Sequence, residues 1–511
     1  MPSRPLSRRG FMAASAVPAA VGPAVVATST PAGAAETVLP TDPFTLGVAS
    51  GDPLPGAVAL WTRLAPSPTA PDLGMAGQAA IAVEWAVATS ADALDTSPVA
   101  AGTATAEPTH AWSIHVDVEG LRPDTAYWYR FRCGTWTSPV GRTHTTPVPS
   151  ADTAARFAVL SCQNLAKPGG GVFALNPLAD LAARDEVDFV VHLGDYVYEF
   201  GRPGHVPPRP CTTLEDYRRR YGQYKSTAAL QDLHAQVPVY VVPDDHDYFD
   251  NVAGRDPQLT AAQGARFDAA IQAYWENMPL RGGPPVRDAA SGRLQLTFQR
   301  AVRWGRHLEL LVVDDRQYRV PGATILGAPQ LEWLLDRVAG SHATWTAIGS
   351  GVPVAWFPDF AGAADKWTGF DTDRSALTDA LARRLGQRAH RPFNPVVLSG
   401  DTHRGLVTHV RQRQDADSAL VATEFVGPPV TSNSGADFAP NADRGAYREQ
   451  YAYTDGGLQS YRGYLRCVAD AGAWTTEYHL GDDVVHPGTP LTAVARWQLE
   501  VGADVGAVRS L

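Results

Sequence analysis

The sequence predicts an α/β protein in which an immunoglobulin-like β-sandwich precedes a layered α/β domain. Three observations support this fold class. Short strand-like segments fill residues 36–147, strand-like and helix-like segments alternate from residue 155 onward, and acidic residues and histidines directly follow several apolar runs. A chain of 511 residues is long enough for two domains of ordinary size.

Residues 36–147 have the pattern of a β-sandwich. Turn residues such as Gly-Asp-Pro and Arg-Pro-Asp separate short apolar segments, a spacing typical of immunoglobulin-like folds. The expected strands are 57–64, 79–89, 114–118 and 126–133. No group of residues here has catalytic spacing, so we expect a packing or substrate-flanking module that ends at the linker 145–150.

Residues 155–490 have the pattern of a mostly parallel α/β domain. Helix-like periodicity occurs in four segments between apolar runs, at 178–184, 214–233, 329–339 and 374–385. The end of the chain, 491–511, is expected to be a carboxyl-terminal tail.

The first 35 residues are predicted to be a twin-arginine export signal. Ser-Arg-Arg-Gly-Phe-Met at 7–12 matches the twin-arginine pattern, and the apolar stretch 13–26 is too short to span a membrane. Ala-Gly-Ala at 32–34 suits a signal peptidase, which puts the mature start near Ala35. We therefore expect the twin-arginine export machinery as a partner, a secreted or cell-envelope location and no integral membrane span. A chance arginine pair in an alanine-rich terminus is the alternative.

Charge and cysteine content narrow the possible functions. The formal net charge of −10 gives no basis for nucleic-acid binding through bulk electrostatics. An exported chain can hold disulfides, but its four cysteines do not by themselves define pairs. Cys162 differs from the others because it follows the apolar run 157–160, which places a potential thiolate at a strand end. A buried structural cysteine is the alternative.

Metal-ligating residue types follow three further apolar runs. The run 187–193 leads into GDYVY at 194–198, the run 237–242 into PDDHD, and the run 395–399 into GDTH. Ligands and catalytic groups collect at the carboxyl ends of strands in open α/β sheets. The sequence therefore predicts one polyvalent metal site assembled from distant segments, which indicates metal-assisted hydrolysis.

One set of these residues has the donors for a first metal ion. Phosphoester hydrolysis commonly uses two ions about 3.5–4 Å apart, which clamp the phosphoryl oxygens and generate a hydroxide nucleophile near neutral pH. Asp195 is the candidate bridge between the ions. Cys162, Tyr198 and His403 would complete the first ion's shell, and such anionic oxygen and sulfur donors favour ferric iron.

The second ion and the proton transfer have their own candidates. Asp245 and Asp401 would give the second ion an oxygen-rich shell, which suits calcium, manganese or magnesium. His246, next to Asp245, can protonate or hydrogen-bond a leaving oxygen. Direct metal ligation is the alternative for His246.

An arginine clamp is predicted from a fourth apolar run. The run 308–313 leads into DDRQYR at 314–319. A guanidinium at a strand end can hold phosphoryl oxygens in a bidentate grip and offset charge in the transition state. Arg316 is the expected clamp and Arg319 the expected structural ion pair, although a purely structural ion pair is the alternative for Arg316 as well.

Taken in order, these motifs resemble the alkaline phosphatase D (PhoD-like) family, a branch of the calcineurin-like metallophosphoesterases. The residues that carry the resemblance are SCQ at 161–163, GDYVYE at 194–199, DDHD at 244–247, DRQYR at 315–319 and GDTH at 400–403. In the amino-terminal region, FTLGVASGDP at 44–53 and LWTRL at 60–64 are similar to that family's β-rich leading domain. The resemblance covers nearly the whole mature chain.

The resemblance implies phosphomonoesterase or phosphodiesterase activity in a four-layer α/β/β/α core, with ferric iron and calcium as cofactors. It implies that iron is held by Cys162, Asp195, Tyr198 and His403, and calcium by Asp195, Asp245 and Asp401. The expected substrate is a small phosphoester or a phospholipid headgroup.

Two departures from the broader metallophosphoesterases concern the second ion. Asp245 and Asp401 replace an asparagine and a histidine, which matches the PhoD-like branch and favours a hard ion. After the strand expected at 345–349 the chain has SGVP and no imidazole, so this ion is expected to be loosely held. The segment 366–370 resembles a family segment near the site mouth, and packing is the alternative for its aromatic residues.

The leading interpretation is an exported phosphatase that releases orthophosphate from monoesters. A diesterase of the phospholipase D kind would use the same metals, because loops over the strand ends decide the size of the leaving group. A non-catalytic exported binding protein on the same scaffold is the alternative from another functional class.

Overall fold

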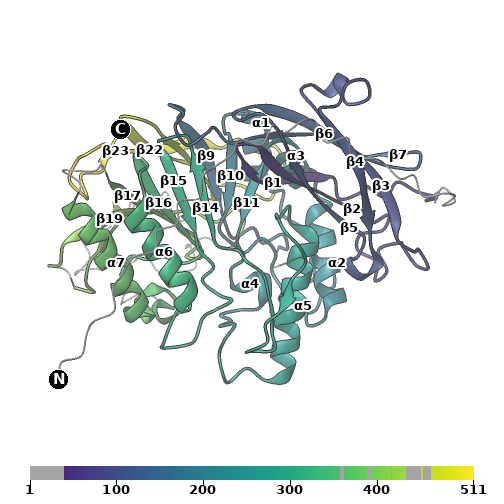
Figure 1. The fold of residues 1–511 in the computed structure, drawn as a ribbon. Helices are drawn as coiled ribbons and strands as arrows, with labels where there is room; N and C mark the ends of the chain where they lie inside the picture. Colours follow the sequence, from purple (N-terminus) through teal and green to yellow (C-terminus); the bar gives the residue numbers. More distant parts are fainter. Residues whose placement is uncertain are drawn as a thin grey trace, which may run out of the picture. The chain divides into compact units, whose positions relative to one another are not determined.

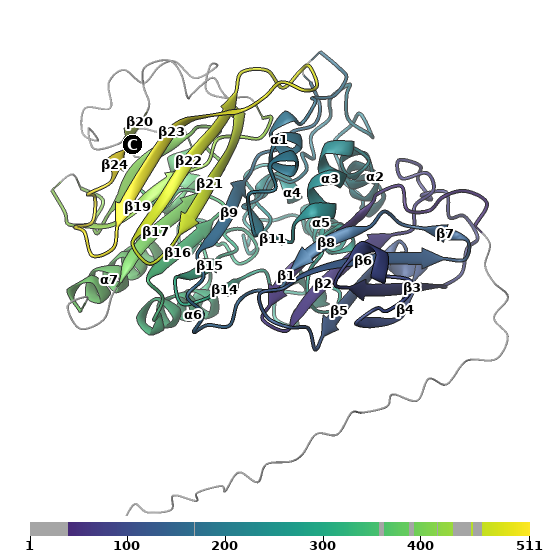
Figure 2. The ribbon, with the colours of Figure 1, turned by 90° about the horizontal axis from the view of Figure 1, so that it is seen from above.

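Two β-sheets lie against each other between two layers of helices, in an α/β/β/α arrangement (Figures 1 and 2). The computed structural model describes residues 39–511, except for 168, 357–361, 388–392, 416, 433–450 and 453–461. The expected export signal at 1–35 lies outside the described residues. The four layers confirm the fold class that the sequence predicts.

The first sheet contains ten strands among the described residues. In spatial order they are β24 (Arg509–Ser510), β23 (Thr492–Glu500), β22 (Ala473–Gly481), β21 (Arg462–Ala469), β9 (Ala155–Leu160), β10 (Phe189–His192), β11 (Val239–Val241), β1 (Val48–Leu54), β2 (Ala57–Arg63) and β5 (Ser113–Glu119). The central strands β9, β10 and β11 are parallel and fully buried apart from one residue of β9, as expected for strands covered on both faces.

The second sheet contains seven strands among the described residues. Their order is β14 (Arg300–Trp304), β15 (Leu308–Val312), β16 (Trp345–Ser350), β17 (Asn394–Ser399), β19 (Leu420–Val426), β18 (Leu406–Arg411) and β20 (Tyr451–Ala452). The strands β15, β16, β17 and β19 are parallel to one another. Buried side chains of both sheets, such as Trp474 on β22 and Trp345 on β16, pack together in one core.

Helices cover the outer faces of both sheets. The α-helices are α1 (Asn176–Arg184), α2 (Leu214–Lys225), α3 (Ala228–Gln236), α4 (Asp245–Tyr248), α5 (Ala261–Asn277), α6 (Ala328–Gly340) and α7 (Asp371–Gly386). Figure 2 shows α1 and α3 beside the first sheet and α6 and α7 beside the second. Leu334 and Val338, one turn apart on α6, are fully buried, which is why this amphipathic helix lies on the sheet. No helix in the described part of the chain has the length and apolar character to cross a membrane.

The amino-terminal sandwich shares a sheet with the α/β domain. Its second layer consists of β4 (Ala100–Ala106), β3 (Ile81–Ala88), β6 (Ala126–Cys133), β7 (Trp136–Thr137) and β8 (Gly141–His144). Its first layer is β1, β2 and β5, and β1 pairs in parallel with β11 through Gly51 and Val239. A Cβ atom at Gly51 would lie 2.3 Å from the carbonyl oxygen of Pro279, so only glycine permits this approach.

Two segments differ from their sequence-based expectation. The helix expected at 214–233 is divided at Ser226 and Thr227, whose hydroxyls donate to the carbonyls of Gly222 and Tyr224 and so compete with continuation of the helix. The expected tail at 491–511 contains β23, which pairs antiparallel with β22 along its length. Its buried side chains alternate at Ala495, Trp497 and Leu499, the two-residue period of a strand.

Candidate metal centre

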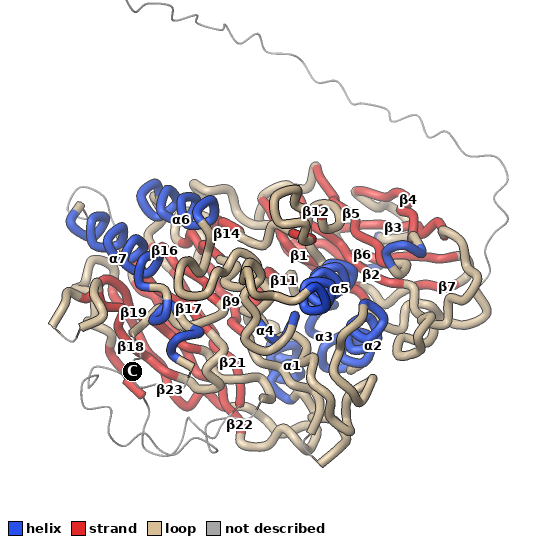
Figure 3. The backbone as a smooth tube through the Cα atoms, turned by 90° about the horizontal axis from the view of Figure 1, so that it is seen from below, coloured by secondary structure: helices blue, strands red, loops and turns tan. Residues whose placement is uncertain are grey.

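The candidate ligands lie where β9, β10, β11 and β17 end, on the face that Figure 3 shows, where loops gather around α4. Parallel pairing of β9, β10 and β11 brings the residues that follow them to one edge. The amide of Cys162 donates to the carbonyl of Gly194 at 3.2 Å, which joins the first two strand ends. In the second sheet, the amide of Gly400 donates to the carbonyl of Gly351 at 3.1 Å and joins the ends of β17 and β16.

Four of the predicted ligands have left-handed backbone conformations. The φ angles are 59° at Cys162, 55° at Asp195, 62° at Asp401 and 55° at His403. Each such conformation costs a non-glycine residue about 1–3 kcal/mol and persists only where the surrounding structure imposes it. Of the twelve non-glycine residues with positive φ in the described part of the chain, four are thus predicted ligands, a conformation often found at functional sites.

The first donor cluster consists of Cys162, Asp195, Tyr198 and His403. Ligand atoms of Cys162, Asp195 and His403 lie within 4.8 Å of one another. The hydroxyl of Tyr198 donates to Oδ2 of Asp195 at 2.9 Å and lies 3.1 Å from Nε2 of His403. The structure thus brings together the four residues that the sequence assigns to the first ion.

The acidic cluster consists of Asp244, Asp245 and Asp401, whose carboxylate oxygens also lie within 4.8 Å of one another. Asp245 belongs in addition to a group with Asp195 and His246, so it connects this cluster to the first one. Oδ2 of Asp244 and Oδ1 of Asp245 accept no hydrogen bond from any residue that the structure describes. Buried carboxylate oxygens without such partners are costly, and a cation would compensate them.

Electrostatics in the first donor cluster also favour a cation. Burial raises the pKa of the Cys162 thiol and of the Tyr198 phenol well above their ordinary values, and the charge of Asp195 acts in the same direction. Burial likewise raises the pKa of Asp195. These groups become anionic donors only when a nearby positive charge stabilises them, which is what a bound polyvalent ion supplies. The donor set therefore fits a metal ion.

Opposing effects act on the acidic cluster. Burial raises the pKa of Asp244 to about 8, although Arg316 acts in the opposite direction. Burial also opposes ionisation of Asp245, but there the charge of Arg316, the charge of His246 and the hydrogen bond from the amide of Asn251 together outweigh it, and the pKa lies below its ordinary value. Neighbouring carboxylates in one site thus differ in how readily they ionise: Asp244 makes the closer ion pair with Arg316, but Asp245 has the additional positive neighbours His246 and Lys366.

His246 lies between the two clusters and is oriented by a carboxylate. Its Nδ1 lies 2.8 Å from Oε2 of Glu199, and its ring packs on that of Tyr198 with 4.3 Å between centroids. Burial by itself lowers the pKa of His246, but the charges of Asp245 and Asp195 reverse this and raise it well above its ordinary value. Bound cations would act against these carboxylates, so they would moderate this rise.

Arg316 is buried beside the acidic cluster. Its guanidinium forms an ion pair with Asp244 and donates to Oδ1 of Asp365 at 2.9 Å. Its Nη2 lies 3.5 Å from Oδ1 of Asp245 and 3.7 Å from Oδ1 of Asp401. Arg319 forms an ion pair with the same Asp365 at 2.6 Å, as expected for a structural role.

Sequence reasoning did not assign several residues that the structure places in this site. Asp244 was visible beside Asp245, and Glu199 closes the GDYVYE motif, so both had a local signal. Asp365 had no comparable signal, because it ends a short 3₁₀ turn rather than follows a strand, and Lys366 was noted only as the start of a segment that resembles one near the site mouth. Ser432, which donates to the hydroxyl of Tyr198 at 2.6 Å, had none either.

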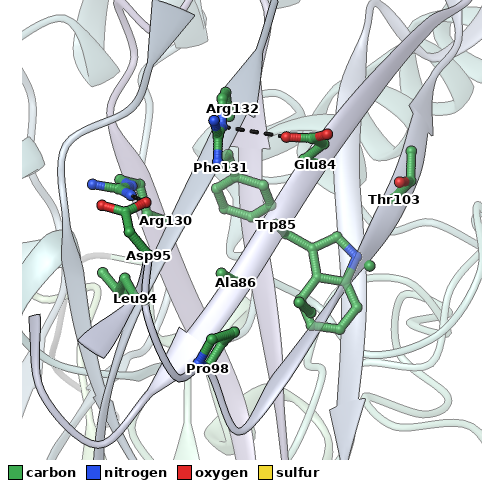
Figure 4. A pocket seen from close by; sticks show the side chains of 12 residues that line it. Glu84, Trp85, Ala86, Leu94, Asp95, Pro98, Thr103, Arg130, Phe131 and Arg132 are labelled. Atoms are coloured by element: carbon green, nitrogen blue, oxygen red, sulfur yellow. Dashed lines mark hydrogen bonds and ion pairs between the residues drawn. The ribbon is translucent and has the colours of Figure 1, made fainter. Parts of the chain in front are cut away.

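A cavity in the amino-terminal region lacks such chemistry. It is a cavity of about 400 Å³ on the face of β3, β4 and β6 (Figure 4). Its charged residues are two ion pairs, Glu84 with Arg132 and Asp95 with Arg130. Since no histidine or cysteine lines it, the strand ends remain the candidate active site.

Two protein families match the chain in separate regions. The PhoD-like phosphatase family matches residues 157–478, and the PhoD-like phosphatase N-terminal domain matches residues 29–147. The chain belongs to the PhoD-like phosphatase family. Alkaline phosphatase D of Bacillus subtilis (strain 168) is 34% identical over 492 residues, covering 89% of this chain and 80% of that protein. This PhoD-like phosphatase is therefore a phosphoric ester hydrolase.

Solved structures agree with the family. A structure of PhoD superposes with a TM-score of 0.79 and 30% sequence identity, covering 93% of both chains. The purple acid phosphatase PPD1 from yellow lupin (Lupinus luteus) seeds superposes with a TM-score of 0.54 over 90% of this chain and 75% of that chain. At 13% identity, the lupin protein shows a shared fold only.

Proposed function

We propose that this PhoD-like phosphatase is an exported, metal-dependent enzyme that hydrolyses phosphate monoesters, phosphodiesters or both. The observation that carries this proposal is the convergence of Cys162, Asp195, Tyr198 and His403 from segments up to 241 residues apart in sequence. A thiol, a carboxylate, a phenol and an imidazole in one buried place have the chemistry of a metal shell.

The donor chemistry supports ferric iron and calcium. Iron would be held by the first donor cluster, and calcium by Asp195, Asp245 and Asp401, with manganese or magnesium as alternatives for calcium. When bound, the two ions would polarise the phosphoryl group and activate water for the attack. Asp195 would be the shared ligand, because its carboxylate lies within reach of both clusters.

His246 would supply the proton for the leaving oxygen. Glu199 accepts a hydrogen bond from Nδ1, which leaves Nε2 as the nitrogen for proton transfer. The backbone amide of His246 donates to Oδ1 of Asp195 at 3.2 Å, so the imidazole is anchored to the proposed bridging ligand. Both contacts fix the ring before substrate arrives, and such preorganisation lowers the barrier.

Arg316 would offset negative charge on the phosphoryl group. Asp244 and Asp365 hold its guanidinium, which is fully buried. The same guanidinium lies next to Asp245 and Asp401, the proposed calcium ligands. A cation fixed in this place stabilises a transition state without reorganising.

The domain organisation is part of the proposal. We propose an export signal at 1–35, an amino-terminal domain at 36–147 and a catalytic domain at 155–490, to whose sheet β23 is added. The two family matches, at 29–147 and 157–478, support these limits. Export by the twin-arginine machinery rests on the motif at 7–12.

Metal analysis combined with a substrate panel tests the function. Purified protein is expected to contain iron and calcium and to hydrolyse nitrophenyl phosphate. Hydrolysis of bis(nitrophenyl) phosphate or phosphatidylcholine in preference to the monoester would favour the phospholipase D-like alternative. Full activity in protein free of iron would contradict the proposed metal centre.

A further inference from the structure

The ammonium of Lys366 lies in the acidic cluster. Lys366 stands between the 3₁₀ segments Ala363–Asp365 and Trp367–Gly369, and its side chain is 9% exposed. Its Nζ forms an ion pair with Oδ2 of Asp401 and lies 4.0 Å from Oδ2 of Asp365. Asp401 is one of the proposed calcium ligands, so a resident cation already contacts an oxygen that the ion would use.

The neighbouring residue fixes the backbone at this point. Trp367 is fully buried, and its indole Nε1 donates to Oγ of Ser350, the last residue of β16, at 3.1 Å. The amide of Gly369 donates to the carbonyl of Lys366 at 2.9 Å and closes the turn. The backbone is therefore fixed, whereas the four-carbon stem of the lysine can change rotamer.

The two basic groups at the acidic cluster differ in how firmly they are held. Arg316 forms ion pairs with Asp244 and Asp365, and its side chain has no exposed surface. Lys366 keeps a small exposed fraction, 9% of its side chain, and among the described residues makes its close ion pair with Asp401 alone, since Asp365 lies 4.0 Å away. If a divalent cation binds Asp401, it repels the ammonium and reduces the negative charge that holds it there. Lys366 is then the cation that moves.

We propose that Lys366 competes with the second metal ion for Asp401 and that its displaced ammonium binds the phosphoryl oxygens of the substrate. This inference rests on the proposed function, because it requires calcium at Asp401. An ammonium has three hydrogen-bond donors and no acceptor. Once the metal ion has bound Asp401, an anionic phosphate is therefore a suitable new partner for the ammonium. The metal ion and the Lys366 ammonium would thus bind the same carboxylate oxygen of Asp401 in alternation.

Calorimetric titrations of wild type and Lys366→Met test both parts of the proposal. In iron-loaded, calcium-free protein, Lys366→Met is expected to bind calcium about tenfold more tightly, because the competing cation is gone. In calcium-loaded protein, the same variant is expected to bind inorganic phosphate about tenfold more weakly. Lys366→Arg keeps the charge and should stay closer to wild type in both titrations.

Arg130→Met is the matched control. It removes one positive charge from a distant ion pair with Asp95 (Figure 4), so neither affinity should change. Unchanged or weaker calcium binding in Lys366→Met overturns the competition, and unchanged phosphate binding overturns the second role. If wild type binds neither calcium nor manganese nor magnesium, the proposed function itself fails. Lys366→Gln serves as a second neutral variant, and loss of folding in both variants would show that Lys366 is a structural counter-ion and refute the proposal.

Discussion

Oε2 of Glu199 lies 2.8 Å from Nδ1 of His246. The two residues follow different strands, β10 and β11, which are parallel neighbours in the first sheet. Oε1 of the same carboxylate accepts the backbone amide of Asp250 at 2.9 Å, so Glu199 is itself held in place. The imidazole therefore has a fixed orientation, and this relationship makes its role testable.

Removing the imidazole should slow the reaction without removing the metals. His246→Ala is expected to lower kcat by ~10²–10⁴ because the leaving oxygen loses its proton donor. Steady-state kinetics and elemental analysis of the same preparation measure both quantities. Loss of iron together with activity would show that His246 is a metal ligand instead. Glu199→Gln, which keeps a hydrogen-bonding side chain, should give a smaller loss.

Asp195→Asn should remove metal and activity together. The substitution keeps the size of the side chain but removes the charge that both proposed ions share. Metal content by elemental analysis and turnover of nitrophenyl phosphate are the measurements. Asp185→Asn is the control, since Asp185 pairs with Arg142 outside the two clusters. Normal iron content and full turnover in Asp195→Asn would refute the bridging role.

Tyr198 should produce a visible absorption band. A phenolate bound to ferric iron absorbs visible light, so the purified protein is expected to show a phenolate-to-iron band that Tyr198→Phe removes. Ser432→Ala offers a graded control, because Oγ of Ser432 donates to the Tyr198 hydroxyl at 2.6 Å and its loss should shift the band without abolishing it. An active enzyme without colour or iron would contradict the choice of ion.

Acid should destabilise the fold through buried histidines. Burial lowers the pKa of His192 to about 3, and its Nε2 has no hydrogen-bond partner in the described part of the chain. The imidazole of His192 therefore takes up a proton near pH 6.5 in the unfolded chain but only near pH 3 in the folded chain. The free energy of unfolding therefore falls as the pH drops from about 6.5 towards 3. At pH 5 this one group should lower the free energy of unfolding by about 2 kcal/mol relative to its value at high pH.

Denaturant unfolding at pH 7.5 and pH 5 measures the contribution of His192. In His192→Asn the stability difference between the two pH values should be about 2 kcal/mol smaller than in wild type. The asparagine side chain can still accept the amide of Gly194, which donates to Nδ1 of His192 at 3.3 Å. His486→Asn, at a largely exposed position, should behave as wild type. An equal pH dependence in wild type and His192→Asn would mean that His192 does not carry the effect.

Local motifs made much of the site predictable. Asp195 and Asp401 each follow a buried strand through a glycine, and this pattern is contained in a few consecutive residues. Asp244 and Glu199 lie inside the same motifs, although their contacts were not foreseen. The contacts of Asp365 with Arg316 and of Lys366 with Asp401 could not be found in this way, because they join residues 35 to 49 positions apart in sequence and follow no repeating pattern.

The order of the strands in the sheets could not be predicted from local sequence patterns either. Alternating hydrophobicity identified β6 at its observed bounds, but nothing in that pattern states that β1 would pair with β11. At that contact a Cβ atom on Gly51 would lie 2.7 Å from the carbonyl oxygen of Val239, a residue 188 positions later in the chain. Likewise, residues 492–500 belong to the first sheet because they pair antiparallel with β22, a contact that their own sequence pattern does not specify.

By itself, the sequence determined the strands, the turn residues after them and the donor types, because backbone preference and hydrophobic period are properties of neighbouring residues. Only the tertiary structure decided which carboxylates share a cation, which one orients His246 and where Lys366 stands. Those relationships depend on distances across two packed sheets, and electrostatic coupling is set by such distances and by burial rather than by order along the chain.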